Sequence, residues 1–209
     1  MIEEIYIATD IETDGPSPGQ YSMLSFASVA FRLDKSIIGT FERNLDLLPG
    51  ARQDPKVMRF WKNNPEAWAA CRENPVPTAQ AMKDYADWLR GLGATPVMVA
   101  HPVGFDYTFI HWYLHEFTGG SPLFPAGLDI TSYAMALMGT PYTKSHKRYM
   151  PTEWIDPDFP HTHKALDDAL GHAMVFCNMV AANPNARTMP DDKSGTASQR
   201  RKANPPRES

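Results

Sequence analysis

The sequence feature that most constrains the fold is a short apolar run that leads directly into two acidic residues. Residues 5–8 are followed by Asp10 and Glu12, and Gly15-Pro16 interrupts the chain shortly afterwards. An apolar run rich in β-branched residues and bounded by Gly and Pro predicts a strand that ends in a loop. Because alternate residues of a strand face the same way, we expect the two carboxylates to project side by side at the strand end.

Two carboxylates this close repel each other unless a positive charge lies between them. Oxygen ligands on one face are what Mg²⁺ and Mn²⁺ prefer, which makes a metal site one interpretation. A polar turn after a strand is the other, because Asp-Gly and Pro-Gly pairs are common in turns. The pair alone does not decide between the two interpretations.

The length of 209 residues predicts one domain, residues 1–183, followed by a disordered and mildly basic tail, residues 184–209. Hydrophobic residues make up 43% of the chain, enough for a core, and a net charge of −4 argues against general duplex binding. With two cysteines, no disulfide framework is expected. The sequence suggests neither a signal peptide nor a membrane span. We therefore expect a cytoplasmic protein with no membrane partner.

Hydrophobic patterning predicts three strands, then helices that alternate with strands. After the first strand, strands at 23–31 and 37–47 are expected to form an antiparallel meander. Residues 55–71 predict short helical pieces, whose aromatic side chains either line a groove for bases or form a small satellite core. The later elements are expected to be a helix at 78–92, a strand at 96–100, a helix to about 117, an edge strand at 128–130, a helix at 131–138 and a last helix from about 163 to 181.

Residues 139–160 show no regular pattern, because prolines interrupt them. Lys144, His146, Lys147 and Arg148 lie there among tyrosines and a tryptophan. Cations mixed with aromatic rings suit single-stranded nucleic acid, and a solvated basic loop explains the same composition equally well.

Two further acidic residues lie where strands give way to helices. Asp106 follows the strand at 96–100, and Asp168 comes five residues after His163, near the start of the last helix. Ligands of α/β sheets gather at such strand ends, although an acid in the first turn of a helix also complements the helix dipole. In the last helix, the pattern places Asp168 and His172 opposite the apolar face.

Three motifs in order resemble those of the DEDDh family of 3'-to-5' exonucleases, the epsilon-subunit-like nucleases that include ribonuclease T and oligoribonuclease. DIETDG at 10–15 is similar to the first motif, and HKALDDA at 163–169 resembles the third, H-x-A-x-x-D-A. HPVGFD at 101–106 resembles the second, in which N-x-x-F-D is usual. The usual Asn is missing here, so its contacts are not carried over. The resemblance covers residues 6–180.

The resemblance implies a ribonuclease-H-like α/β fold, with three antiparallel strands followed by two parallel ones in a five-stranded mixed sheet flanked by helices. It also implies two divalent metal ions, Mg²⁺ or Mn²⁺, as cofactors. Their ligands would be Asp10, Glu12, Asp106 and Asp168. His163 would take the proton of the attacking water, as general base.

By the same resemblance, the backbone at Thr13 would hold the terminal sugar, and Met23, Leu24 or Phe26 would wedge against the last base. The implied function is a metal-dependent 3'-to-5' exonuclease that releases nucleoside 5'-monophosphates from single-stranded RNA or DNA. The alternatives are a catalytically idle nucleic-acid-binding module on the same fold and a proofreading or oligonucleotide-trimming phosphodiesterase. Family members are often homodimers, and residues 55–68 would offer an apolar surface for one.

Overall fold

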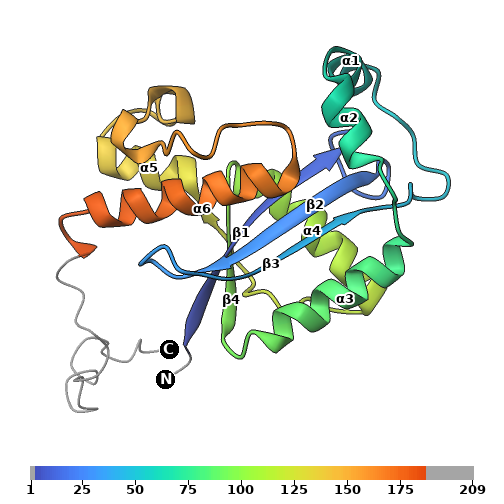
Figure 1. The fold of residues 1–209 in the computed structure, drawn as a ribbon, viewed down its shortest axis with the longest axis horizontal. Helices are drawn as coiled ribbons and strands as arrows, with labels where there is room; N and C mark the ends of the chain where they lie inside the picture. The colour runs from blue at the N-terminus through green and yellow to red at the C-terminus, as the bar shows by residue number, and fades with distance from the viewer. Residues whose placement is uncertain (1–2, 187–209) are drawn as a thin grey trace, which may run out of the picture.

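A computed structural model of the protein describes residues 3–186, in which five strands form one mixed sheet between layers of helices (Figure 1). The strands are β1 Glu4–Thr13, β2 Met23–Phe31, β3 Ile37–Asn44, β4 Thr95–Ala100 and β5 Leu128–Asp129, in the order β3-β2-β1-β4-β5. β1, β2 and β3 pair antiparallel, whereas β4 and β5 extend the sheet in parallel from β1. The predicted ribonuclease-H-like sheet is confirmed. The predicted tail lies almost wholly outside the described residues.

In the described part of the chain, six α-helices connect and cover the strands. They are α1 Pro55–Asn63, α2 Pro65–Cys71, α3 Thr78–Gly91, α4 Val103–Thr118, α5 Ile130–Met138 and α6 Ala165–Ala182. The irregular stretch between α5 and α6 contains three short 3₁₀ turns, η1 Tyr142–Lys144, η2 Lys147–Tyr149 and η3 Thr152–Trp154. None of the described helices is both long and apolar enough to cross a bilayer.

One face of the sheet packs against α3 and α4. Alternate residues of β1 point to this face, among them Ile7 and Ile11, which join Tyr85 of α3 and Tyr113 of α4 in one core. Tyr85 is fully buried, and its hydroxyl forms a hydrogen bond of 2.8 Å with that of Ser28 on β2. The polar group is therefore satisfied inside the core.

The opposite face of the sheet carries α6 and α5. Small residues allow α6 to approach closely: Ala8 of β1 packs with Ala169 and Ala173. The predicted helix face requires a correction, because Asp168 and His172 are buried, at 1% and 3% exposed. The loop between α5 and α6 and the sheet cover α6 on more than one side, so its buried surface extends beyond a single apolar stripe.

The two short helices α1 and α2 form a satellite core at the end of β1 and β2. Trp61 packs there with Leu24, Ala67 and Cys71. Of the two interpretations of residues 55–71, the structure favours the satellite core over a groove lined with stacked rings.

Candidate active site

The last residues of β1 carry two carboxylates on the face covered by α6. Asp10 and Glu12 alternate with Ile11, which is buried in the core of the opposite face. The side chain of Asp10 is 15% exposed, and Glu12 is 9% exposed. Pairing of β1 with β2 continues as far as Thr13. The strand therefore fixes the direction of both carboxylates, as the alternation of residues predicted.

The start of α6 brings a third carboxylate to the same place. Asp10, Glu12 and Asp168 each contribute a carboxylate oxygen, and these oxygens all lie within 4.8 Å of one another. The oxygens of Asp168 also accept hydrogen bonds from the backbone N–H groups of Thr162, at 3.0 Å, and His163, at 3.1 Å. Acids from opposite ends of the chain thus share one small volume, and the loop before α6 orients one of them.

The start of α4 supplies the fourth predicted acid. Asp106 is 3% exposed, and the backbone of Ile11 hydrogen-bonds to its carboxylate. It lies outside the set of three acids whose oxygens fall within 4.8 Å. After burial, repulsion from Asp106 is nevertheless the largest cause that raises the pKa of Asp10. Asp106 therefore belongs electrostatically to the same site.

Burial and mutual repulsion favour the protonated forms of the acids on β1. Burial raises the pKa of Asp10 most. Repulsion from Asp106, Glu12 and Asp168 raises it further, so that it lies well above its ordinary value. Burial, then Asp168 and Asp106, raises the pKa of Glu12 to about 8. A divalent cation relieves such repulsion, and an all-oxygen ligand set suits a hard ion. The acidic cluster therefore fits the predicted cofactor, Mg²⁺ or Mn²⁺.

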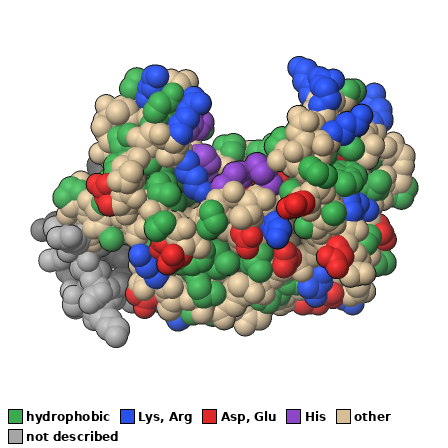
Figure 2. All heavy atoms as spheres, turned by 45° about the horizontal axis from the view of Figure 1, so that its top comes forward, with side chains coloured by type: hydrophobic (Ala, Val, Ile, Leu, Met, Phe, Trp, Pro, Cys, Tyr) green, Lys and Arg blue, Asp and Glu red, His purple; other side chains and the backbone are tan. Residues whose placement is uncertain are grey.

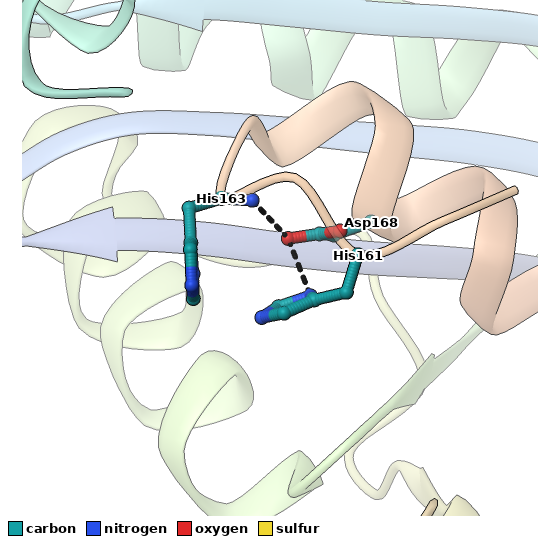
Figure 3. Close-up of side chains that lie close together, drawn as sticks. All are labelled: His161, His163 and Asp168. Atoms are coloured by element: carbon teal, nitrogen blue, oxygen red, sulfur yellow. Dashed lines mark hydrogen bonds and ion pairs between the residues drawn. The ribbon is translucent and has the colours of Figure 1, made fainter. Parts of the chain in front are cut away.

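Asp168 departs from this trend because its neighbours donate hydrogen bonds to it. Burial raises the pKa of Asp168, but the hydrogen bonds from His161 and from the backbone of Thr162 outweigh burial, so the pKa falls below its usual value. His161 Nδ1 lies 2.8 Å from Asp168 Oδ2 (Figure 3). The sequence had indicated no role for this second histidine.

His163 lies just before α6, as predicted. Its ring packs edge-on against Phe60 of α1, with centroids 5.0 Å apart, and against His161, at 4.2 Å. Burial, then His161, lowers the pKa of the His163 imidazole, and Asp168 opposes this. A neutral imidazole at physiological pH is able to accept a proton.

Lys147 is a further charged group at the site. It lies in η2, and its charge lowers the pKa of Asp10, while Asp168 and Asp10 in turn favour the charged ammonium against burial. A Cβ at Gly171 would lie 3.7 Å from Lys147 Nζ, an ordinary contact distance, so the ammonium packs against this turn of α6. The sequence had placed Lys147 only in a basic loop, without relating it to the acids.

Buried His172 lies beside Asp10, and partly buried His101 lies next to His172. His172 Nδ1 is 4.0 Å from Asp10 Oδ1, and the rings of His172 and His101 are 6.0 Å apart. Burial, then Lys147, lowers the pKa of His172 to about 3 and that of His101 to about 4. Within residues 3–186, His172 Nδ1 and His101 Nε2 have no hydrogen-bond partner. Both imidazoles are therefore neutral and add no positive charge.

The residues predicted to contact substrate lie deeper than expected. Met23, Leu24 and Phe26 have no exposed surface, so they lie in the cores of the protein rather than at a surface that a base can reach. The carbonyl oxygen of Thr13 accepts a hydrogen bond of 2.9 Å from Trp61 Nε1. Phe60, beside His163, is 36% exposed and is the large apolar side chain available there.

The surface is hollowed between two projecting parts, and histidine side chains line the hollow (Figure 2). One projecting part is formed by α1 and α2, and the other by α5 and the loop that follows it (Figure 1). Lys and Arg side chains lie on both (Figure 2). The exposed cations of these segments include Lys56, Arg59, Lys62, Lys144 and Arg148. Exposed cations therefore lie on both sides of the hollow, although the net charge of the chain is −4.

Comparison with known proteins identifies a curated relative, the 3'-5' DNA exonuclease Cap18 of Escherichia coli. It is 30% identical over 179 residues, which cover 83% of this chain and 90% of the relative. A comparison with models of protein families found no match.

Solved structures of 3'-exonucleases share the fold. The nuclease domain of 3'hExo, described as a DEDDh family member bound to rAMP, matches with a TM-score of 0.61 and 13% identity over 85% of this chain and 91% of that one. A 3'-exonuclease that recognises a histone mRNA stem-loop matches with a TM-score of 0.62 and 11% identity, over 84% of this chain and 63% of that one. Given the shared fold, the converging acids and the similarity to Cap18, the chain belongs to the DEDDh family of 3'-to-5' exonucleases.

Proposed function

We propose that the protein removes nucleoside 5'-monophosphates one at a time from the 3' end of single-stranded DNA. The observation that carries the proposal is the convergence of Asp10, Glu12 and Asp168, whose carboxylate oxygens lie within 4.8 Å of one another. DNA is the proposed substrate because the relative Cap18 is named a DNA exonuclease.

Asp10, Glu12, Asp106 and Asp168 would hold two divalent ions. Such ions, when bound, neutralise the charge of a scissile phosphate and lower the pKa of a bound water. The raised pKa values of Asp10 and Glu12 support this assignment, because carboxyls that repel one another gain most from a cation.

His163 would accept the proton of the attacking water on its imidazole. The water oxygen forms a bond to phosphorus, and the bond from phosphorus to the 3' oxygen of the preceding nucleotide breaks. The lowered pKa of His163 supports this role, since the imidazole is neutral before the reaction. Lys147, whose charge acts on Asp10 and Asp168, would offer its ammonium to a phosphate oxygen.

A single strand fits the basic sides of the hollow better than a duplex. Cations on both projecting parts would contact successive phosphates, while exposed Phe60 beside His163 would stack on a base. The overall charge of −4 gives no broad basic face for a duplex.

The experiment compares 5'-labelled single-stranded DNA, single-stranded RNA and a duplex with a 3' overhang, each with Mg²⁺, with Mn²⁺ and with a chelator. We expect a ladder shortened from the 3' end, release of 5'-monophosphates, a preference for single-stranded DNA and no cleavage with chelator. Asp10→Asn should remove the activity. Cleavage that persists in chelator, or an absolute preference for RNA, would contradict the proposal.

A cytoplasmic location and assembly into a homodimer remain expectations for this protein. Cys71 and Cys177 are free and buried, which is compatible with a reducing compartment. Light scattering of the purified chain would measure the oligomeric state.

A further inference from the structure

A second histidine, His161, lies at the active site two residues before His163. Its Nδ1 is 2.8 Å from Asp168 Oδ2, and its ring centroid is 4.2 Å from that of His163. Figure 3 shows both imidazoles on the same side of the loop, next to the Asp168 carboxylate. Neither the motif pattern nor the proposed hydrolysis gives His161 a role.

The three side chains form a compact donor set. One ligand atom from each of His161, His163 and Asp168 lies within 4.8 Å of the others. Nitrogen and oxygen ligands of one zinc ion, each about 2 Å from the metal, lie roughly 3–4 Å apart. The side chain of His161 is 54% exposed, so its ring has room to rotate when an ion binds. Hydrogen bonds from the backbone of Thr162 and His163 already fix the Asp168 carboxylate.

This donor set differs chemically from the acidic cluster beside it. Asp10, Glu12 and Asp168 offer only oxygen, which suits Mg²⁺ or Mn²⁺, whereas His161 and His163 add two imidazole nitrogens to Asp168. Imidazole suits Zn²⁺, and Zn²⁺ binds nitrogen ligands more tightly than Mn²⁺ does. Asp168 is common to both sets, so the two kinds of ion compete for it.

We propose that His161, His163 and Asp168 form a separate site for Zn²⁺ or a similar transition-metal ion, and that its occupation inhibits the exonuclease. A metal-bound imidazole of His163 has no lone pair left to accept the proton of water. The same ion withdraws Asp168 from the acidic cluster. The inhibitory part rests on the proposed function, whereas the binding part rests on the donor set alone.

Binding is tested on the full chain without Mg²⁺, with Zn²⁺ in calorimetry and Co²⁺ as a spectroscopic probe. We expect one tightly bound ion per chain that is distinguished from any ion in the acidic cluster by Co²⁺ absorption bands typical of imidazole ligands. His161→Gln should weaken Zn²⁺ affinity about tenfold or more. His115→Gln is the matched control, because His111 and His115 on α4 form another close pair, with ring centroids 4.3 Å apart. Unchanged affinity in His161→Gln, or loss of binding in His115→Gln, would overturn the proposal.

Inhibition is tested by adding Zn²⁺ to the Mg²⁺-dependent cleavage of single-stranded DNA, each variant being compared with its own zinc-free rate. The wild type and His115→Gln should be inhibited at the same Zn²⁺ concentration, and His161→Gln should require about tenfold more. Equal inhibition of all three would refute the inhibitory site while leaving the nuclease intact. Absence of Mg²⁺-dependent cleavage in the wild type would instead refute the proposed function, and the Co²⁺ spectra would still decide the metal site.

Discussion

The indole Nε1 of Trp61 donates a hydrogen bond of 2.9 Å to the carbonyl oxygen of Thr13, one residue beyond Glu12. Trp61 belongs to α1 and is 3% exposed, so this bond is buried. It ties the projecting part formed by α1 and α2 to the strand that carries two of the acids. It is one of several bonds that position this part relative to the acids, together with those from Asp54 N–H to the carbonyl oxygen of Asp14 and from Asn44 Nδ2 to that of Ala70, both 2.8 Å.

Trp61→Phe should keep most of the packing and remove this bond. A buried carbonyl without a partner costs about 1–3 kcal/mol, so we expect a loss of that size in the free energy of unfolding, measured by urea denaturation. KM for single-stranded DNA should rise as well, because α1 carries exposed cations. Trp68→Phe is the matched control, since Trp68 packs in the same cluster without a bond to β1. Equal losses in both variants would show that packing, rather than the bond, matters.

Asp167 and Asp168 are adjacent, but only Asp168 reaches the acidic cluster. Asp167 instead accepts a hydrogen bond of 2.8 Å from the hydroxyl of Thr162. We expect Asp168→Asn to lower kcat on the order of 10³-fold, because metal ligands supply several kcal/mol of transition-state stabilisation. Asp167→Asn should remain within a few-fold of the wild type, because an amide oxygen can still accept the bond. Circular dichroism checks that both variants fold, and equal losses of activity would contradict this assignment.

His163→Gln separates proton transfer from metal binding. General-base catalysis contributes about 10²–10⁴-fold, and we expect kcat to fall by that factor. The rise in melting temperature caused by Mn²⁺ should persist, because Asp10, Glu12 and Asp106 remain. Single-turnover cleavage and thermal unfolding measure the two effects separately. Unchanged turnover would remove His163 as the base.

Local pattern and tertiary packing explain which parts of the fold the sequence predicted. The alternation in residues 23–31 predicted β2 with its observed bounds, but all nine residues of the strand are buried, so the strand is covered on both faces of the sheet rather than one. The apolar run at residues 5–8 marked β1, but pairing with β2 carries the strand through Asp10 and Glu12 to Thr13.

The parts that the sequence did not predict depend on contacts between distant segments. His161 acquires its place from the turn that the loop makes before α6, and no periodic pattern encodes that turn. Lys147 acts on the acids because the irregular loop between α5 and α6 folds back towards them, and no local residue pattern encodes that path. The family resemblance implies that Met23 or Phe26 contacts the last base, but packing against α3 and α4 buries both side chains.

The metal-free protein should lose stability as pH rises towards 8. The folded-state pKa of Glu12 is raised from 4.5 to about 8. Its contribution to the free energy of unfolding is therefore complete below pH 4.5 and is lost as pH rises through about 8. Asp10 shifts in the same direction. Partly buried His101 and buried His172, with pKa values lowered to about 4 and 3, contribute stability that is lost only as pH falls below about 6.5.

Between pH 6.5 and 8, the titration of the two carboxyls should therefore determine how stability changes with pH. Two measurements test this. The melting temperature without metal should fall with pH in this window, and the increase caused by Mn²⁺ should grow, because fewer protons compete with the ion. Glu12→Gln should flatten both trends. A pH-independent increase with Mn²⁺ would contradict the raised pKa values.

Lys147→Met tests whether the loop between α5 and α6 takes part in the reaction. Loss of a charged donor to a phosphate costs about 1.5–3 kcal/mol, so kcat/KM on single-stranded DNA should fall about 10- to 100-fold. Lys144→Met is the matched control, because Lys144 lies in the same loop, is exposed and stacks over the ring of Tyr149 at 4.9 Å. The Lys147 variant should also show a weaker salt dependence of KM, since one phosphate contact is gone. If both variants lose activity equally, the loop acts only as a diffuse basic surface. If only Lys147→Met is impaired, the ammonium acts at the scissile phosphate, where its charge already opposes that of Asp10.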